Sequence, residues 1–316
     1  MIKIQEVVDD AKCYEQVRAL RWPERVTCPY CGGHKIKKRG YHSNQAGRQR
    51  YQCRKCKKHF DDLSKTPFAG HHQPLKVWLL CLYFMGLDLS NHQIAQELDL
   101  NKDDVQEMTT YLRQMVYDRR SPAQLEGEAE FDEVYLVAGH KGYPTIVQEL
   151  GRSGRRNRLK GARGRGTLEA EKPPIFGMIQ RSGELIIQML PNVQQKTIQP
   201  LIQQHVKPGT LIYTDEYNIY FRLKTWGYAH KTVNHSQGEY ARDEDGDGFH
   251  EVHTNTIEGV WSLLRSWLRP HRGISQEKLP LYLAFFEFVH NVRKRGKALL
   301  SSLLQLLLAP CLHANS

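Results

Sequence analysis

The sequence lacks the long apolar runs of a membrane protein and the leader of a secreted one. Its longest apolar candidate, residues 303–309, is far shorter than the roughly 20 residues that cross a bilayer. Residues 1–10 are too polar for a signal peptide. Cysteines number only seven, and four of them form two Cys-x-x-Cys pairs, which fits a reducing compartment better than a disulfide framework. We therefore expect a cytoplasmic protein.

Acidic residues are scarce in two segments. Residues 1–60 carry 15 Lys and Arg against 5 Asp and Glu, and residues 152–165 carry seven cations and no acid. The net charge of the 316 residues is +11, so the remainder of the chain stands at −6 once the +10 and +7 of these segments are removed. Two concentrated basic patches on a mildly acidic body favour a nucleic-acid partner. The composition is otherwise that of a globular protein with two or three domains.

The two Cys-x-x-Cys pairs frame the first basic segment. Cys28 and Cys31 are separated by 21 residues from Cys53 and Cys56, close to the spacing of a zinc ribbon. Each pair makes a turn that aims two thiolates at one ion, and two pairs complete a tetrahedral zinc site. Redox use is the alternative, which the surrounding cations disfavour. Because so small a module has little core, the metal is expected to supply much of its folding free energy. The remaining cysteines (Cys13, Cys81 and Cys311) are interpreted as packing residues.

Residues 67–126 are predicted to be helical. An apolar helix is expected over 74–85, and segments 89–98 and 103–116 form a helix-turn-helix pattern in which Ser90 caps the first helix. The pattern permits insertion of the second helix into a DNA groove. However, acids near its start would face phosphates, so a helical bundle that only packs or dimerises is the alternative.

From about residue 127 the pattern is typical of an α/β domain with a mixed sheet. Strands are expected at 130–137, 174–180, 185–190, 210–214 and 230–233, and helices at 197–206, 217–225, 255–268, 276–295 and 297–308. Residues 139–166 form a Gly- and Arg-rich excursion between the first two strands.

Two aspartates belong to these strands. Asp132 lies on the apolar face of its strand, where a carboxylate is costly unless a metal or hydrogen bonds compensate it. Asp215 follows the apolar strand residues Leu211-Ile-Tyr213, at the edge where α/β sheets present ligand-binding groups. Asp215 alone would equally suit a helix N-cap. Together the two aspartates predict a site for Mg²⁺ or Mn²⁺, of which two ions can act on one phosphodiester.

A third ligand is expected from the tetrapeptide Asn255-Thr-Ile-Glu258. The tetrapeptide fits a capping box, in which Glu258 would satisfy backbone donors and bind no metal. Alternatively, Glu258, or Asn255 one turn earlier, reaches the ions. The nearby run from Asp243 to Gly248 imitates half of a calcium loop, but its twelfth position is Thr254, so an acidic surface loop is expected. For His250 and His253 the alternatives are a metal ligand, a solvated side chain and a contact to a substrate phosphate.

The motifs together resemble a bacterial insertion-sequence transposase of the IS1595 type, also called ISXO2-like. The matching segments run in the family's order from about Pro23 to Arg293: Cys28-Pro-Tyr-Cys31, Arg50-Tyr-Gln-Cys53-Arg-Lys-Cys56, Pro74-Leu-Lys-Val-Trp-Leu79, Asp132-Glu-Val-Tyr135, Arg163-Gly-Arg-Gly-Thr167, Tyr213-Thr-Asp-Glu-Tyr217, Val233-Asn-His-Ser-Gln-Gly-Glu-Tyr240 and His253-Thr-Asn-Thr-Ile-Glu-Gly-Val-Trp-Ser-Leu-Leu264. The chain departs from the family in residues 242–249, which look inserted, and in Leu136-Val-Ala138, where a glycine-rich turn is usual.

The resemblance implies a ribonuclease H-like fold with a DDE-type site that hydrolyses DNA ends and joins the freed 3′-hydroxyl to target DNA. It makes Asp132 and Asp215 the metal-binding aspartates and leaves Glu258 and Asn255 as candidates for the third residue; we favour Glu258, with Asn255 orienting the site. The expected cofactors are structural Zn²⁺ and two catalytic Mg²⁺ or Mn²⁺ ions.

Four segments are expected: an N-terminal helix and zinc ribbon (1–66), the helix-turn-helix-like region (67–126), the catalytic domain (127–296) and a C-terminal helix (297–316). The expected partner is double-stranded DNA, both terminal inverted repeats and target, bound by a homodimer or higher oligomer near the bacterial nucleoid. The DNA-binding candidates are Lys37, Lys38, Arg39, Arg48, Arg50, Arg54, Lys55, Arg155, Arg156, Arg163 and Arg165. A non-catalytic DNA-binding regulator and a nuclease without strand transfer are the alternatives.

Overall fold

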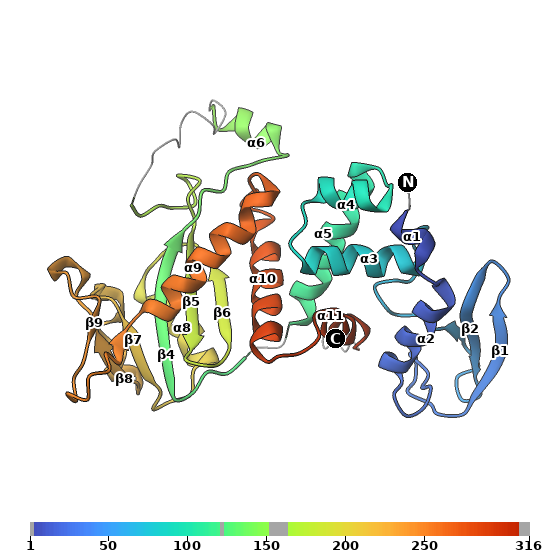
Figure 1. Cartoon of the computed structure of the whole chain (residues 1–316), viewed down its shortest axis with the longest axis horizontal. Coiled ribbons are helices and arrows are strands. Elements are labelled where there is room, and N and C mark those ends of the chain that lie inside the picture. The colour runs from blue at the N-terminus through green and yellow to red at the C-terminus, as the bar shows by residue number, and fades with distance from the viewer. Residues whose placement is uncertain (1–2, 121–122, 152–163, 310–316) are drawn as a thin grey trace. The chain divides into compact units, whose positions relative to one another are not determined.

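The computed structural model describes residues 3–120, 123–151 and 164–309 (Figure 1). The chain divides into two compact units: the first comprises Met1–Arg120 with Lys297–Ser316, and the second comprises Ser121–Gly296. The C-terminal segment therefore belongs to the same unit as the N-terminal one. Division of the first unit into separate ribbon and helical domains stays a prediction.

The first unit begins with two helices, α1 (Ile4–Val7) and α2 (Asp10–Arg21). The break falls at Asp9, which is extended and whose side chain accepts hydrogen bonds from the backbone of Ala11 and Lys12. This is an ordinary N-cap. A three-stranded antiparallel sheet follows, in the order β1 (Ile36–His42), β2 (Gln45–Cys53) and β3 (His59–Asp61).

A buried aspartate fastens α2 to this sheet. Asp62 is fully buried and receives two hydrogen bonds from the Arg18 guanidinium, at 2.9 and 2.7 Å. Its carboxylate also accepts from the Tyr51 hydroxyl and the Gln49 backbone N–H. A buried carboxylate that is paired and fully hydrogen-bonded is tolerated, whereas loss of one partner would be costly. Helix α2 and the ribbon are thus one structure.

The helical part of the first unit contains α3 (Leu75–Gly86), α4 (Asn91–Leu98), α5 (Lys102–Arg119) and α11 (Leu299–Leu308). The predicted cap on α4 is confirmed: Ser90 and Gln93 form a reciprocal capping box. Helix α11 packs against α2, α3 and α5. Its closest approach is at Gly86, where a Cβ would lie 2.7 Å from a Leu299 side-chain carbon. A larger residue at position 86 would force the Leu299 side chain to shift.

A five-stranded mixed sheet forms the centre of the second unit. Its order is β6 (Leu185–Met189), β5 (Pro174–Gln180), β4 (Glu128–Tyr135), β7 (Leu211–Thr214) and β8 (Ala229–Thr232). β4, β5 and β6 pair antiparallel, whereas β4, β7 and β8 pair parallel. The mixed α/β architecture predicted from the sequence is therefore present.

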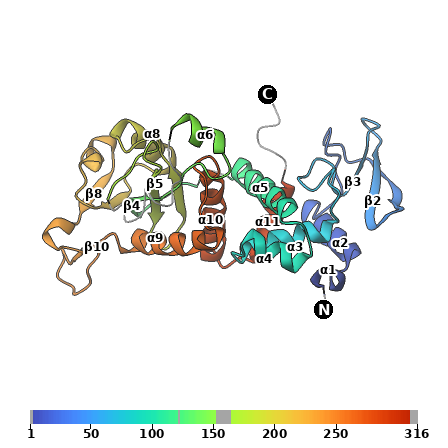
Figure 2. The same ribbon diagram turned by 90° about the horizontal axis from the view of Figure 1, so that it is seen from above.

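Helices cover both faces of this sheet (Figure 2). Helix α8 (Gln195–His205) packs on the face that carries Ala129 and Phe131. Helix α9 (Asn255–Leu268) crosses the other face, where a Cβ on Gly177 would lie 2.3 Å from the Trp261 ring. Helix α10 (Leu279–Lys294) packs along β6. Asp132 lies on the face covered by α9, because side chains alternate along a strand.

The connections contain shorter elements. Helix α6 (Pro144–Glu149) lies between β4 and β5, and the strands β9 (Ala241–Arg242) and β10 (Val252–His253) form a hairpin around the loop that looked inserted. The helix predicted at 217–225 is wrong: the structure has two 3₁₀ turns, Asn218–Tyr220 and Lys224–Trp226. A helix of nine residues is marginal by itself, so burial of Ile219, Tyr220 and Leu223 in the core decides the local conformation.

Among the described residues, no helix combines the length and apolarity needed to cross a membrane.

Candidate functional site

The register of the sheet brings Asp132 and Asp215 side by side. The parallel strands β4 and β7 pair Ala129 with Ile212 and Glu130 with Tyr213. The pairing ends there; continued by two residues, it would set Asp132 opposite Asp215, the first residue after β7. Neighbouring strands lie about 4.8 Å apart, and the charge of Asp215 acts on Asp132, so the two carboxylates are neighbours at the carboxyl edge of β7.

Burial raises the pKa of both carboxyl groups, because it disfavours their charged forms. Burial, with smaller contributions from the charges of Asp215 and Glu258, raises the pKa of Asp132 to about 6 against the lowering effect of a hydrogen bond from Trp261. That bond runs from the indole Nε1 to Oδ2 of Asp132 at 2.8 Å. Burial likewise raises the pKa of Asp215, whose Oδ1 accepts from the Tyr217 backbone at 3.0 Å. Two hard oxygen donors whose charges repel in a partly buried place fit a divalent cation of the Mg²⁺ class.

The capping-box alternative for Asn255 and Glu258 is wrong. Thr254, not Asn255, precedes the first helical residue of α9, and its side chain makes no cap hydrogen bond. Glu258 accepts a hydrogen bond from the Thr254 hydroxyl at 3.2 Å instead of reaching back to the backbone. Its carboxylate is about half exposed and lies 3.9 Å from Nε2 of His235. Glu258 is therefore not engaged in helix capping.

The residue that caps α9 is Glu130, which the sequence analysis missed. Its fully buried carboxylate accepts from the backbone N–H groups of Thr256 and Ile257, at 2.8 and 3.1 Å, and from the Thr256 hydroxyl. Arg181 neutralises it with a 2.9 Å hydrogen bond and also donates to the His253 carbonyl. Glu130 lies two residues before Asp132 on the same face of β4, and this alternation was the available signal. The contact fixes the start of α9 to the strand that carries Asp132.

Glu133, next to Asp132, belongs to the opposite face of the sheet. Its carboxyl accepts a hydrogen bond from the buried Tyr220 hydroxyl. Burial raises the pKa of Glu133 to about 8, against the lowering effect of that hydrogen bond. The adjacent acids Asp132 and Glu133 are thus separated by the sheet.

Among the described residues, two groups place three or more potential metal ligands within 4.8 Å of one another. One is the four cysteines, and the other is the loop that contains Asp243, Asp245 and Asp247. Asp132, Asp215 and Glu258 are less tightly gathered. In the loop, Asp243 accepts from the backbone of Gly246 and Gly248, as in an ordinary acidic turn. Exposed acidic turns are common without an ion, so the loop remains an acidic surface loop.

The four cysteines form the expected cluster. Sγ of Cys28 lies 3.6 Å from Sγ of Cys56, and Sγ of Cys31 lies 3.7 Å from Sγ of Cys53. A tetrahedral zinc ion with Zn–S bonds of about 2.3 Å requires sulfur separations of roughly 3.8 Å. Backbone N–H groups, chiefly that of Cys56, lower the pKa of Cys53 to about 7, whereas burial raises that of Cys28 to about 11. The donor set fits zinc, with a small aromatic core around Tyr51 and Phe60 beside it.

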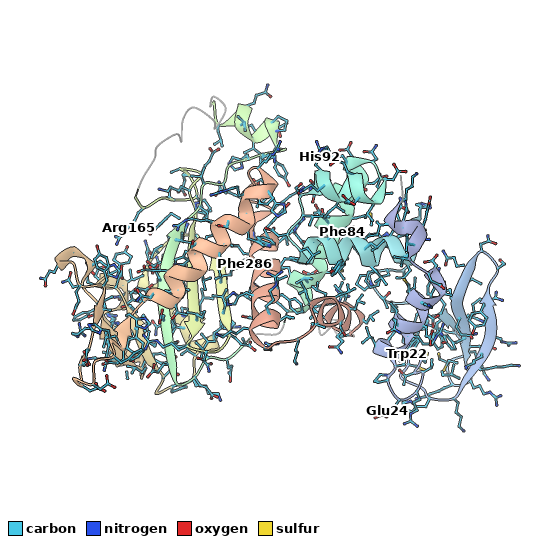
Figure 3. The ribbon with its side chains drawn as sticks, viewed as in Figure 1. Trp22, Glu24, Phe84, His92, Arg165 and Phe286 are labelled. Atoms are coloured by element: carbon cyan, nitrogen blue, oxygen red, sulfur yellow. The ribbon has the colours of Figure 1, made fainter. Side chains whose placement is uncertain are left out.

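The candidate DNA-binding cations fall into four groups. Lys37, Lys38 and Arg39 on β1, Arg50 on β2 and the turn residues Arg54 and Lys55 are exposed. Arg48 instead forms an ion pair with Asp61 at 2.7 Å. Arg155, Arg156 and Arg163 lie outside the described residues. Arg165 lies over the ring of Tyr217, 3.6 Å from its centre (Figure 3).

This combination of a mixed sheet, paired aspartates and a four-cysteine cluster is that of a DDE-type transposase with a zinc ribbon, and family comparison agrees. A model of the ISXO2-like transposase domain matches residues 124–291, and a model of the transposase zinc-ribbon domain matches residues 8–59. The chain belongs to the ISXO2-like transposase family, which confirms the resemblance seen in its motifs.

Relatives carry transposon names. The chain is 32% identical over 310 residues to a protein of the transposable element ISH50 from Halobacterium salinarum, over 96% of this chain and 99% of that one. It is 31% identical over 103 residues to a transposase-like protein from Haemophilus influenzae, over 33% of this chain and 77% of that one. A solved chain of the simian T-cell lymphotropic virus intasome with a PP2A regulatory subunit aligns over 65% of this chain and 66% of its own, at 9% identity and a TM-score of 0.28, which carries no argument about the fold.

Proposed function

We propose that the protein is an active DNA transposase that binds insertion-sequence ends, hydrolyses a phosphodiester bond there and joins the 3′-hydroxyl ends to target DNA. The observation that carries the proposal is the closeness of Asp132 on β4 and Asp215 directly after the parallel neighbour β7, in a chain of the ISXO2-like family. We further propose that the mixed five-stranded sheet is ribonuclease H-like. Its strand order is β6-β5-β4-β7-β8, and β5 runs antiparallel to the other four strands. This arrangement supports that assignment.

In this proposal Asp132 and Asp215 hold the catalytic cations. Divalent ions of the Mg²⁺ or Mn²⁺ class, when bound, supply the positive charge that the attacking and leaving oxygens of a phosphodiester require. Trp261 holds one oxygen of Asp132, and the Tyr217 backbone holds one oxygen of Asp215. Both carboxylates are therefore oriented by the protein before any cation arrives, which reduces the reorganisation needed for binding.

We propose Glu258 as the third acidic residue, with Asn255 beside it orienting the site. Three features support Glu258: its freedom from the helix cap, its electrostatic effect on Asp132, and the anchoring of its helix by Glu130. Asn255 is exposed at the first helical position.

The choice between the two residues predicts unequal mutant effects. Glu258→Gln should lower the cleavage rate on the order of 10²–10³-fold, because a metal-facing charge worth several kcal/mol is lost. Asn255→Ala should lower it only about tenfold, the effect of one orienting hydrogen bond. Cleavage rates at saturating Mn²⁺ would measure both, with Ser262→Ala, exposed one turn later on α9, as the control. The reverse ranking would make Asn255 the third residue.

The remaining assignments follow from charge and chemistry. We propose that the four cysteines hold one structural Zn²⁺ and that the exposed cations of β1, β2 and the Cys53–Cys56 turn grip the phosphates of double-stranded DNA, together with the basic residues near 155–165. Two DNA ends must meet in one complex, so we propose a homodimer or higher oligomer on DNA, acting at the nucleoid in the cytoplasm.

The function can be tested with the purified full-length chain. Duplexes that carry the terminal repeats of its own insertion sequence should be cleaved in Mg²⁺ or Mn²⁺ and not in EDTA, and precleaved ends with a free 3′-hydroxyl should be joined to a target plasmid. Binding without cleavage would instead identify a DNA-binding regulator. Cleavage without joining would identify a nuclease.

A further inference from the structure

We propose that a pocket beside the acidic site holds backbone phosphates of the DNA strand next to the bond that is cleaved. The inference rests on the transposase function proposed above and adds a DNA contact outside the zinc ribbon and residues 152–165. The pocket has a volume of about 550 Å³ and lies between the start of α8 and the turn after β7. Gln195, Lys196 and Gln199 line it from α8, and Tyr217, Asn218 and Arg222 line it from the turn.

Tyr217 joins this pocket to the acidic site. Its backbone N–H donates to the Asp215 carboxylate at 3.0 Å, and Tyr217 also lines the pocket. The Arg165 guanidinium lies over the Tyr217 ring, so a further cation stands beside this residue. The pocket therefore adjoins Asp215, and we expect the phosphates next to the reacting phosphodiester to reach it.

The charges of the pocket suit a polyanion. Lys196 and Arg222 are its charged lining residues, both exposed, and no acidic side chain lines it. Within the described ranges, neither cation forms an ion pair with a carboxylate. This contrasts with Arg48, Lys207 and Arg242, whose charges are each paired with an acidic neighbour. Two unpaired cations facing one space are a phosphate-binding arrangement.

The rest of the lining supports the same ligand. The Gln195 side-chain amide donates to the Asn218 carbonyl at 3.2 Å, which ties the two walls of the pocket together. Helix α8 starts at Gln195 without a side-chain cap, so the positive end of its dipole adds to the charges of Lys196 and Arg222. Cations and an open helix start attract phosphate oxygens, and contacts to phosphates carry no direct sequence information.

The salt dependence of DNA binding tests the proposal. Lys196→Gln with Arg222→Gln in the full-length chain should weaken binding to an insertion-sequence end on the order of tenfold at moderate salt. It should also reduce the slope of log K against log salt by about 1.8, the value for two duplex phosphate contacts. Lys224→Gln, which removes an exposed cation two residues from Arg222 and outside the pocket, should leave the slope unchanged. Unchanged thermal unfolding checks the fold of each variant.

The position of the contact is tested with methylphosphonates, which remove the charge of one phosphate at a time. Neutral phosphates next to the cleavage site should weaken binding by the wild-type chain and have no effect on the double variant. A double variant with the wild-type slope and the wild-type methylphosphonate pattern would overturn the proposal. Competition by inorganic phosphate at constant ionic strength, seen with the wild type and lost in the double variant, would assign the pocket to a free anion and overturn it as well.

Failure of this inference can be separated from failure of the proposed function. If the wild type cleaves and joins DNA while the pocket variants match it in every assay, the function stands and the pocket contact is wrong. If the wild type never cleaves DNA, the function is wrong, and the slope measurement still decides whether the pocket binds phosphates.

Discussion

Replacement of Asp132 or Asp215 by Asn should abolish metal-dependent DNA cleavage, with a loss of about a thousandfold or more, while binding of the DNA ends is retained. Several kcal/mol of charge stabilisation depend on each carboxylate, and about 4 kcal/mol corresponds to a thousandfold in rate. The basic residues proposed to hold DNA phosphates are unchanged in both variants. Cleavage of labelled end DNA and its electrophoretic mobility shift would measure the two properties separately.

Replacement of Asp132 by Asn should not lower the stability of the fold. Burial raises the pKa of Asp132 to about 6. An Asp whose pKa is higher in the folded than in the unfolded state destabilises the fold when it is ionised. The full cost is present above about pH 6. It is absent below about pH 4, where the carboxyl group is protonated in both the folded and the unfolded state. In metal-free buffer at pH 7–8, Asp132→Asn should therefore be more stable than the wild type, on the order of 1–3 kcal/mol. Added Mn²⁺ should stabilise the wild type and not the variant.

Glu128→Gln provides the matched control for these variants. Glu128 lies on the same strand and is exposed, and its 3.1 Å ion pair with Arg181 is a surface contact of small energy. We expect cleavage within about twofold of the wild type, the limit that so weak a pair allows. Wild-type cleavage by either aspartate variant would disprove the assignment of the metal site.

Loss of zinc should unfold the ribbon, the largest expected effect on stability. Zinc binding to such a site contributes about 10–16 kcal/mol of apparent free energy at neutral pH, far more than the small aromatic core around Tyr51 supplies. Cys53→Ser, or a strong chelator, should remove the metal, lower the cooperativity of unfolding and abolish specific binding of insertion-sequence ends. Zinc content by atomic absorption, together with circular dichroism, would follow both changes.

Cys13 provides a thiol control for this experiment. It is a buried, unpaired cysteine on α2 outside the cluster. Cys13→Ala should keep one zinc ion per chain and bind DNA as the wild type does. The second unit is compact by itself, so its fold should survive zinc removal. A Cys53→Ser protein that still held one zinc ion and bound DNA ends normally would contradict the proposed ligand set.

Local patterns were sufficient for much of the fold. Ser90 and Gln93 form their capping box because the interaction involves residues three apart. Helix α9 covers the span that its apolar spacing predicts, Asn255–Leu268. Residues 217–225 were misread as a helix because the burial of Tyr220 and Leu223 against distant strands overrides a weak local preference.

The sequence by itself determined the family and the cysteine quartet and predicted a site at the two aspartates, because these depend on residue type and spacing. Only the tertiary structure decided how the start of α9 is held. The tetrapeptide Asn255-Thr-Ile-Glu258 has the local form of a capping box, but a buried carboxylate 126 positions before Thr256, that of Glu130, takes the backbone donors. The same is true of the pocket at Lys196 and Arg222, whose residues come from separate elements. Contacts between segments so far apart depend on the register of the sheet, which no local pattern contains.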